Sequence, residues 1–395
     1  MVLIISLFIY GLFLSQFNVS IIPESISPKH PKHFYDYSGV TNINTFKSTG
    51  SGSLIDVIKA AQKNNLDFIF ISDLNQFPYT PIPPRYVNNL TVFTAHKFSF
   101  LNAKIINYFP DFLTGPKGLG LLQVQWTELF SKLEKDSDYG IHIISHPFKT
   151  DYSWNKNIGL GIDGIEILNL KKIWQSNWQE SKLSFLWTMI LYPFNPRLSF
   201  LRLFKDQKDE VDLWNKLLKQ RPTMGFSGAD AEAKATLFPG SYVNYPTYQD
   251  IFQISKNHIL LQSELTGDHI RDANKIAQAI KKGQFYFSLD LLANPKGFEA
   301  YLQNSNKDVL PLGTKVKLEN GLKFIVDLPQ KPTVPFDVVF FKDGIQQELT
   351  NSKYSEFSIS SPGSYNIQVK VIPTLPLPDG KKWITWIYTN SVYVE

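Results

Sequence analysis

Several residues that can ligate a metal or transfer a proton follow short apolar runs, at the points where strands would end. Asn42 and Asn44 come after the run that begins at Tyr35, and Asp73 comes directly after FIFIS. The others are His96, Lys97, His146, Glu166, Asp230 and Glu232. Because parallel strands place their working residues at their carboxyl ends, we expect these side chains to converge on one rim. Carboxylates and histidines gathered in this way point to acid–base or metal-assisted chemistry.

Alternating strands and helices must position that rim. Apolar runs predict strands at residues 68–72, 90–94, 104–108, 140–144, 164–168, 224–228 and 259–262. Amphipathic stretches predict helices at residues 54–64, 126–135, 183–192, 210–219, 248–254 and 269–282. This alternation favours a mainly parallel α/β fold, either a barrel or a doubly wound sheet.

The pattern of apolar and turn residues along the chain changes after about residue 296. Short alternating runs are broken by the turn signals Asn320-Gly321, Asp343-Gly344, Pro362-Gly363 and Asp379-Gly380. Their spacing predicts a small antiparallel β-sandwich. We therefore divide the chain into an α/β domain at 35–295 and a β-sandwich at 296–395, preceded by a linker at 21–34.

Residues 1–20 contain an uncharged apolar run, VLIISLFIYGLFLSQF. The run is long for the core of a signal peptide and short for a membrane span, and no Lys or Arg precedes it. We expect a signal peptide or an uncleaved membrane anchor, with a buried N-terminal helix as the alternative. Either of the first two would make the protein extracytoplasmic, secreted or attached to a membrane.

Composition excludes several classes of function. Hydrophobic residues make up 43% of the 395 residues and charged residues 19%, as expected for a well-buried globular protein. The net charge of +5 is mild and no basic run is dense, so nucleic acid is not an expected partner. The absence of cysteine excludes disulfides, thiolate zinc sites and cysteine nucleophiles.

The order of the strand-end motifs resembles the polymerase-and-histidinol-phosphatase (PHP) superfamily, and within it the exported metallohydrolases of the carbaryl-hydrolase type. The resemblance runs from Tyr35 to the C-terminus. It implies a distorted parallel (β/α)7-type barrel, similar to a TIM barrel, followed by the β-sandwich. It also implies a metal-dependent phosphoesterase or hydrolase.

The family's metal-ligand motifs are degenerate in this chain. Its His-x-His is matched by Asn42-Ile43-Asn44, its Thr-Asp-His-Asn by Ser72-Asp73-Leu74-Asn75, its Gly-x-Glu by Ala95-His96-Lys97, its His-Pro by His146-Pro147, and its Gly-x-Asp-x-His by Gly228-Ala229-Asp230-Ala231-Glu232. Of the implied ligands only Asp73, His146 and Asp230 keep their identity. An amide binds a transition metal weakly, leucine cannot bind one, and an ammonium repels it. A shift of one residue in the third motif would place His96 at the ligand position.

Two functions follow from this pattern. The first is a pseudoenzyme without a cofactor, an exported or membrane-tethered protein that binds a small molecule or a protein. In it, the Lys97 ammonium neutralises Asp73, Asp230, Glu232 and Glu166. The alternative is an active hydrolase of phosphoester or ester bonds, with Mn, Zn or Mg held at a reduced site by Asp73, His146, Asp230 and Glu232. In that case His146 and Asp73 are the catalytic candidates, and bound metal separates the two hypotheses.

Overall fold

The structure is a computed structural model. It describes residues 2–23, 33–76, 82–100, 103–109, 118–121, 123–124, 127, 140–149, 162–238 and 241–395. The helix expected at residues 126–135 lies almost entirely outside the described residues. The other predicted strands and helices are present, with bounds that differ by a few residues.

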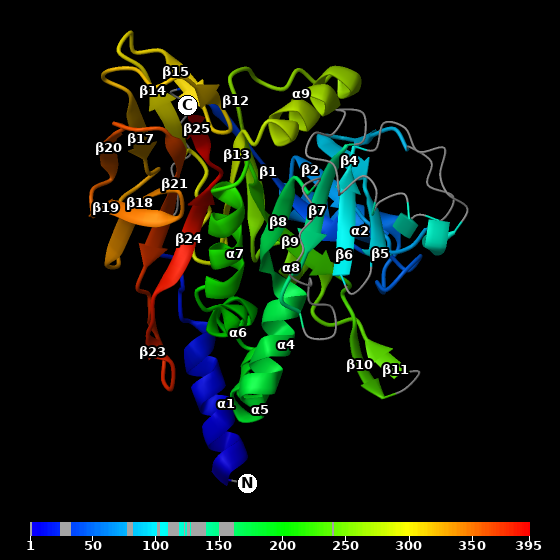
Figure 1. Ribbon diagram of the computed structural model, residues 1–395. Coiled ribbons are helices and arrows are strands. Elements are labelled where there is room, and N and C mark those ends of the chain that lie inside the picture. The colour runs from blue at the N-terminus through cyan, green and yellow to red at the C-terminus, as the bar shows by residue number, and fades with distance from the viewer. Residues whose placement is uncertain are drawn as a thin grey trace.

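In the described part of the chain the helices are α1 (Val2–Ser15), α2 (Leu54–Lys63), α4 (Leu170–Glu180), α5 (Lys182–Leu191), α6 (Pro196–Leu203), α7 (Lys208–Leu218), α8 (Tyr248–Ile251) and α9 (His269–Lys281). The strands of the first part are β1 (Tyr35–Ile43), β2 (Phe68–Ile71), β3 (Arg85–Val87), β4 (Leu90–Thr94), β5 (His96–Phe100), β6 (Ala103–Tyr108), β7 (Ile141–Ser145), β8 (Gly164–Asn169), β9 (Met224–Ala231), β10 (Ala235–Phe238), β11 (Ser241–Val243), β12 (Lys256–Leu261) and β13 (Phe285–Ser288). Figure 1 shows their arrangement.

The central sheet closes on itself as a barrel. Parallel pairs join β2 to β1 and β4, β8 to β7 and β9, and β9 back to β1. A parallel bridge between Leu74 and Lys97 extends the contact of β2 from β4 to β5. The predicted mixed α/β class with a large, mostly parallel sheet is therefore confirmed.

Two of the predicted strands depart from the expected parallel barrel, and one of them, β12, runs antiparallel to both β1 and β13. β6 runs antiparallel to both β5 and β7. Since β6 begins at Ala103 and β5 ends at Phe100, their connection is far too short for the crossover that parallel strands require. The carboxyl end of β6 therefore points away from the rim formed by β1, β2, β7, β8 and β9.

The last part of the chain is mainly antiparallel, as predicted, although β16 and β25 pair in parallel. It contains β14 (Glu299–Gln303), β15 (Val309–Pro311), β16 (Lys315–Val316), β17 (Lys323–Asp327), β18 (Phe336–Lys342), β19 (Ile345–Thr350), β20 (Tyr354–Ser358), β21 (Gly363–Val371), β22 (Thr374–Leu375), β23 (Gly380–Lys381), β24 (Ile384–Thr389) and β25 (Val392–Val394). Phe340 of β18 stacks on Phe357 of β20 at 4.7 Å between ring centroids, so two sheets pack face to face. β24 also pairs with β13, which joins these strands to the central sheet.

Aromatic side chains fill one end of the barrel. Phe70 stacks on Phe93 at 4.6 Å and meets Tyr108 edge-on at 4.8 Å. The apolar face of α9 packs Ala273 and Ile276 into the same cluster. This end is closed by packing, so the polar rim lies at the other end of the strands.

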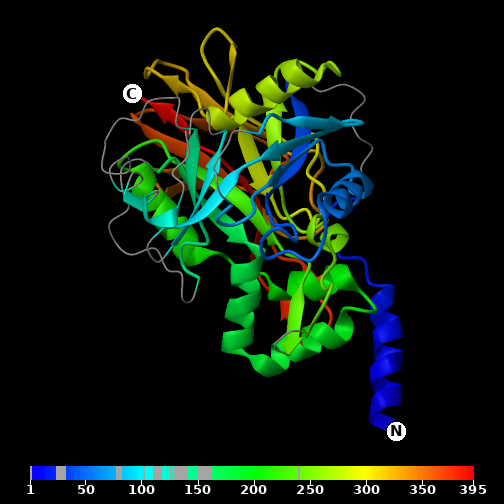
Figure 2. The same ribbon diagram turned by 90° about the vertical axis from the view of Figure 1, so that its right-hand side faces the viewer.

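The apolar N-terminal run forms α1, which projects from the end of the molecule opposite α9 (Figures 1 and 2). Leu14 is buried, and the amide of Asn195 donates hydrogen bonds to the carbonyls of Leu14 (2.9 Å) and Phe17 (3.0 Å). Within the described ranges, no helix is both long enough and apolar enough to cross a membrane.

Candidate functional site

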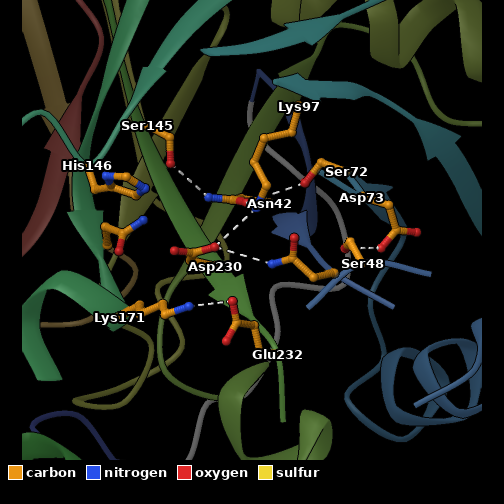
Figure 3. Close-up of polar contacts among 12 residues, drawn as sticks. Asn42, Ser48, Ser72, Asp73, Lys97, Ser145, His146, Lys171, Asp230 and Glu232 are labelled. Carbon is orange, nitrogen blue, oxygen red and sulfur yellow. Dashed lines mark hydrogen bonds and ion pairs between the residues drawn. The ribbon is translucent and has the colours of Figure 1, made fainter. Parts of the chain in front are cut away.

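The strand ends place three rim residues in left-handed backbone conformations. Asn42 has φ 60°, and His146 and Asp230 both have φ 40°. Asn, Asp and His are the non-glycine residues found there most often, so the residue types suit the conformation. The pairing register of β1 also shifts beside Asn42. Figure 3 shows the side chains of Asn42, His146 and Asp230 at these strand ends.

Lys97 lies at the centre of the rim. Its side chain is 1% exposed, and its ammonium donates to Asn42 Oδ1 at 2.8 Å and contacts Asp230 Oδ1 at 3.2 Å. Asn44 donates a second hydrogen bond to Asp230 Oδ1, at 3.2 Å. The side chain of Lys97 therefore points at Asn42 and Asp230.

The charge of Asp230 is set by these neighbours. Burial would raise the pKa of its carboxyl, but the ammonium of Lys97, followed by that of Lys171, holds the pKa well below its ordinary value. Asp230 is therefore a carboxylate throughout the physiological pH range, and Lys97 is its buried counter-ion.

Glu166 is held by neutral donors instead of a cation. Asn42 donates to Oε1 at 2.8 Å, and Ser145 Oγ and the amide of Asn169 each donate to Oε2 at 2.7 Å. Burial, and next the charge of Asp230, raises the pKa of Glu166 to about 7. A Cβ at Gly228 would lie 1.8 Å from Glu166 Oε1, so glycine is needed opposite this side chain.

His146 is buried and uncharged. Burial lowers its pKa to about 3, and the lysines around it act in the same direction, while Asp230 opposes them. Its backbone N–H donates to Glu166 Oε2 at 3.2 Å. The imidazole therefore stands at the rim as predicted, close to Asp230, and it is neutral at ordinary pH.

The remaining predicted residues are engaged elsewhere. Asp73 accepts hydrogen bonds from the Thr45 backbone N–H (2.7 Å), the Thr45 hydroxyl (2.7 Å) and the Ser48 hydroxyl (2.6 Å), and so it fixes the loop after β1. Glu232 forms an ion pair with Lys171. The expectation that Lys97 neutralises all four carboxylates thus applies to Asp230 alone. Leu74 is half-buried and contributes only its backbone bridge.

Further lysines surround the same carboxylates. Lys104 and Lys149 are buried, and Lys171 reaches in from α4. Burial lowers the pKa of Lys149 to about 8, with Asp230 opposing the shift and Lys171 and Lys104 adding to it. Sequence reasoning missed these three because they lie on separate segments. The only sequence signal was position: Lys149 follows His146-Pro147 closely, and Lys171 follows the end of β8.

Divalent metal ions, which the family resemblance implies at this rim, do not fit the residues present. Among the described residues, no three His, Asp or Glu side chains are grouped closely enough to hold one ion. Lys97 places a positive charge against Asp230, and Asp73 is already bonded to the loop after β1. An ammonium at that position repels a divalent cation.

A small cavity opens beside Asp73 and His96. Its volume is about 170 Å³, and Thr45, Lys47 and Arg85 also line it. Ligand pockets are usually larger, roughly 300–1,000 Å³, so this cavity has room only for a small molecule, and Leu54, Ile71 and Val92 make part of its lining apolar.

Comparisons with known proteins found few likenesses. No family model matches the chain, and no curated protein matches it. Among solved structures, the chain is similar to a two-domain protein containing a predicted PHP-like metal-dependent phosphoesterase from Bacteroides vulgatus. That likeness has a TM-score of 0.40 and 10% sequence identity, and it covers 92% of this chain and 98% of the other.

Proposed function

We propose that this protein is a non-catalytic relative of the PHP metallohydrolases, in which a lysine–carboxylate network replaces the metal centre. The observation that carries the proposal is the buried Lys97 ammonium, 2.8 Å from Asn42 Oδ1 and 3.2 Å from Asp230 Oδ1. A buried carboxylate needs a partner charge, and here a side chain of the protein supplies it.

The network lacks the parts that hydrolysis needs. A metallohydrolase uses its ions to lower the pKa of a bound water and to polarise the substrate. Lys97 is a weak substitute for such ions, because its ammonium carries a single charge and two of its three N–H donors already serve Asn42 and Asp230. Asp73, one of the two catalytic candidates, is bound by Thr45 and Ser48. The arrangement supports stable structure and binding, and not turnover.

The role that remains is binding. The cavity beside Asp73 and His96 would take a small ligand, and Lys47 and Arg85 in its lining would attract a negatively charged group, which Asp73 would oppose. Both cations are exposed, so they would add to the rate of encounter more than to affinity.

Turnover assays test this proposal. The full chain is incubated with generic phosphomonoester, phosphodiester and carboxylic ester substrates, with and without added Mn, Zn or Mg. We expect no hydrolysis above that of the His146→Ala variant, which serves as the matched control. Metal-dependent hydrolysis that is lost in His146→Ala would contradict the proposal and support the alternative of a reduced metal site.

A further inference from the structure

One end of the molecule is covered by large apolar side chains. α1, α5 and the β22–β23 hairpin all lie at this end (Figures 1 and 2). Among the side chains of α1 that the structure describes, the exposed large apolar ones are Ile5, Phe8, Ile9, Leu12 and Phe13. Their spacing places all of them on one face of the helix, where a helix exposed to water normally carries polar residues.

The opposite face of α1 packs on the protein. Tyr10 stacks on Trp187 of α5 at 6.1 Å, and its hydroxyl donates to the carbonyl of Leu377 at 2.6 Å. A Cβ at Gly11 would lie 2.7 Å from the ring of Phe194, so the helix approaches this ring closely. α1 is therefore a fixed part of the folded surface, and it carries no charged residue.

α5 adds a second apolar stripe next to the first. Leu183, Leu186 and Ile190 are exposed at helical spacing, and Leu183 is 82% exposed. Leu377, whose carbonyl accepts the hydrogen bond from Tyr10, is exposed as well. Two chain segments about 180 residues apart thus present apolar side chains at one end, and apolar patches of this extent mark interaction sites.

The border of this surface has the composition of a membrane interface. Trp178 and Trp383 are partly exposed, and the ammonium of Lys182 lies 5.6 Å from the centre of the Trp178 ring. Lys381 is exposed at the hairpin. Neither α1 nor α5 contains an acidic residue. Tryptophan and lysine around an apolar centre suit the headgroup region of a bilayer, and the lysines complement anionic lipids.

We propose that this end of the molecule seats on a lipid bilayer, with α1 and α5 inserted together at the boundary between headgroups and acyl chains. The 14 residues of α1 span about 21 Å, less than the roughly 30 Å of a hydrocarbon core, so the helix enters the interface without crossing. The proposal concerns a different face from the lysine–carboxylate network and does not depend on the absence of catalysis.

Sedimentation of the full chain with lipid vesicles tests the proposal. The vesicles are phosphatidylcholine, with or without phosphatidylglycerol, and the variants are Ile9→Glu on α1 and Leu183→Glu on α5. The matched control is Ile270→Glu, because Ile270 is 74% exposed on α9 at the other end of the molecule. We expect each of the two variants to lower binding roughly tenfold and the control to bind as the unmodified chain does.

Four results distinguish the possible occupants of this surface. Loss of vesicle binding in both variants but not in the control supports the proposal. No vesicle binding by the unmodified chain overturns it. Loss of vesicle binding in Ile9→Glu alone contradicts the proposal that α1 and α5 share one membrane surface, and shows that only α1 binds the bilayer. A dimer that forms without lipid and is abolished by both variants, in the absence of vesicle binding, shows that a second copy covers this face.

Discussion

Lys97 is the residue on which the proposed site depends, because it is the buried partner of Asp230. Replacing it by methionine keeps most of the side-chain volume but leaves a carboxylate buried without its counter-ion. Breaking a buried ion pair in this way costs about 3–5 kcal/mol. We expect Lys97→Met to lower the free energy of unfolding, measured by urea denaturation, by an amount in this range.

Two further variants make this prediction specific. Lys97→Met combined with Asp230→Asn removes both charges and should recover part of the lost stability. Lys323 and Glu356 form an exposed ion pair, with side chains that are 44% and 40% exposed. Breaking this pair by Lys323→Met should lower the free energy of unfolding by no more than about 1 kcal/mol. Equal effects of Lys97→Met and Lys323→Met would show that Lys97 is not an essential counter-ion.

The residue scale also shows how much of the site is predictable. Asn42, His146 and Asp230 could be placed on one rim because strand ends are easily recognised from apolar runs. The direction of the Lys97 side chain could not be predicted, because a shift of the strand register by one residue would put His96 in its place. Lys104, Lys149 and Lys171 were missed because only the folded chain brings them to the same carboxylates. The bonds of Asp73 to Thr45 and Ser48 depend on loop geometry that no sequence pattern specifies.

At the scale of elements, Asn195 connects α1 to the rest of the protein. Its side-chain oxygen accepts from the Leu198 backbone N–H and caps α6, and its amide group donates to Leu14 and Phe17. Asn195→Asp keeps the cap but loses both donors. We expect this variant to expose α1 to limited proteolysis and faster hydrogen exchange while the rest of the chain stays protected.

The matched control for this prediction is Asn64→Asp. Asn64 follows α2, and its amide group donates to the carbonyls of Ala60 (2.9 Å) and Gln249 (3.0 Å), so this variant also loses two donors but at another helix. If Asn195→Asp and Asn64→Asp left α1 equally protected, the two hydrogen bonds from Asn195 would not be what holds the helix.

Elements with a strong apolar period were predicted well. The strands at 68–72 and 90–94 and the helices at 54–64 and 269–282 match β2, β4, α2 and α9 closely, because their caps and apolar faces are local in sequence. The bounds of α6 were harder to predict, since Pro196 looks like an interruption of an apolar stretch although it occupies the first turn of that helix. β5 was missed because its residues HKFSF have no turn signal to separate them from the preceding strand.

At the scale of the whole molecule, a buried ion network joins β1, β12 and the segment after β13. His258 lies between Asp36 (3.0 Å) and Asp290 (3.1 Å), while Tyr286 donates to Asp36 and Lys256 pairs with Asp290. Burial would lower the pKa of His258, but the two carboxylates and their hydrogen bonds outweigh burial and raise it to about 9.

This shift predicts a pH dependence of stability. The folded pKa of about 9 lies above the ordinary value of 6.5, so the contribution of His258 is complete below pH 6.5 and is lost as the pH rises through 9. The loss is on the order of 3 kcal/mol. The difference in urea midpoint between the unmodified chain and His258→Gln should shrink over this window. A constant difference would contradict the assignment.

The central claim is that the rim is held together by Lys97 and not by metal. Its most direct test is the metal content of the full chain, purified without chelator from metal-supplemented medium and measured by inductively coupled plasma mass spectrometry. The proposed network predicts Zn, Mn and Fe far below one ion per chain, unchanged in His146→Ala. Stoichiometric, tightly bound metal that is lost in His146→Ala or Asp230→Asn would contradict it.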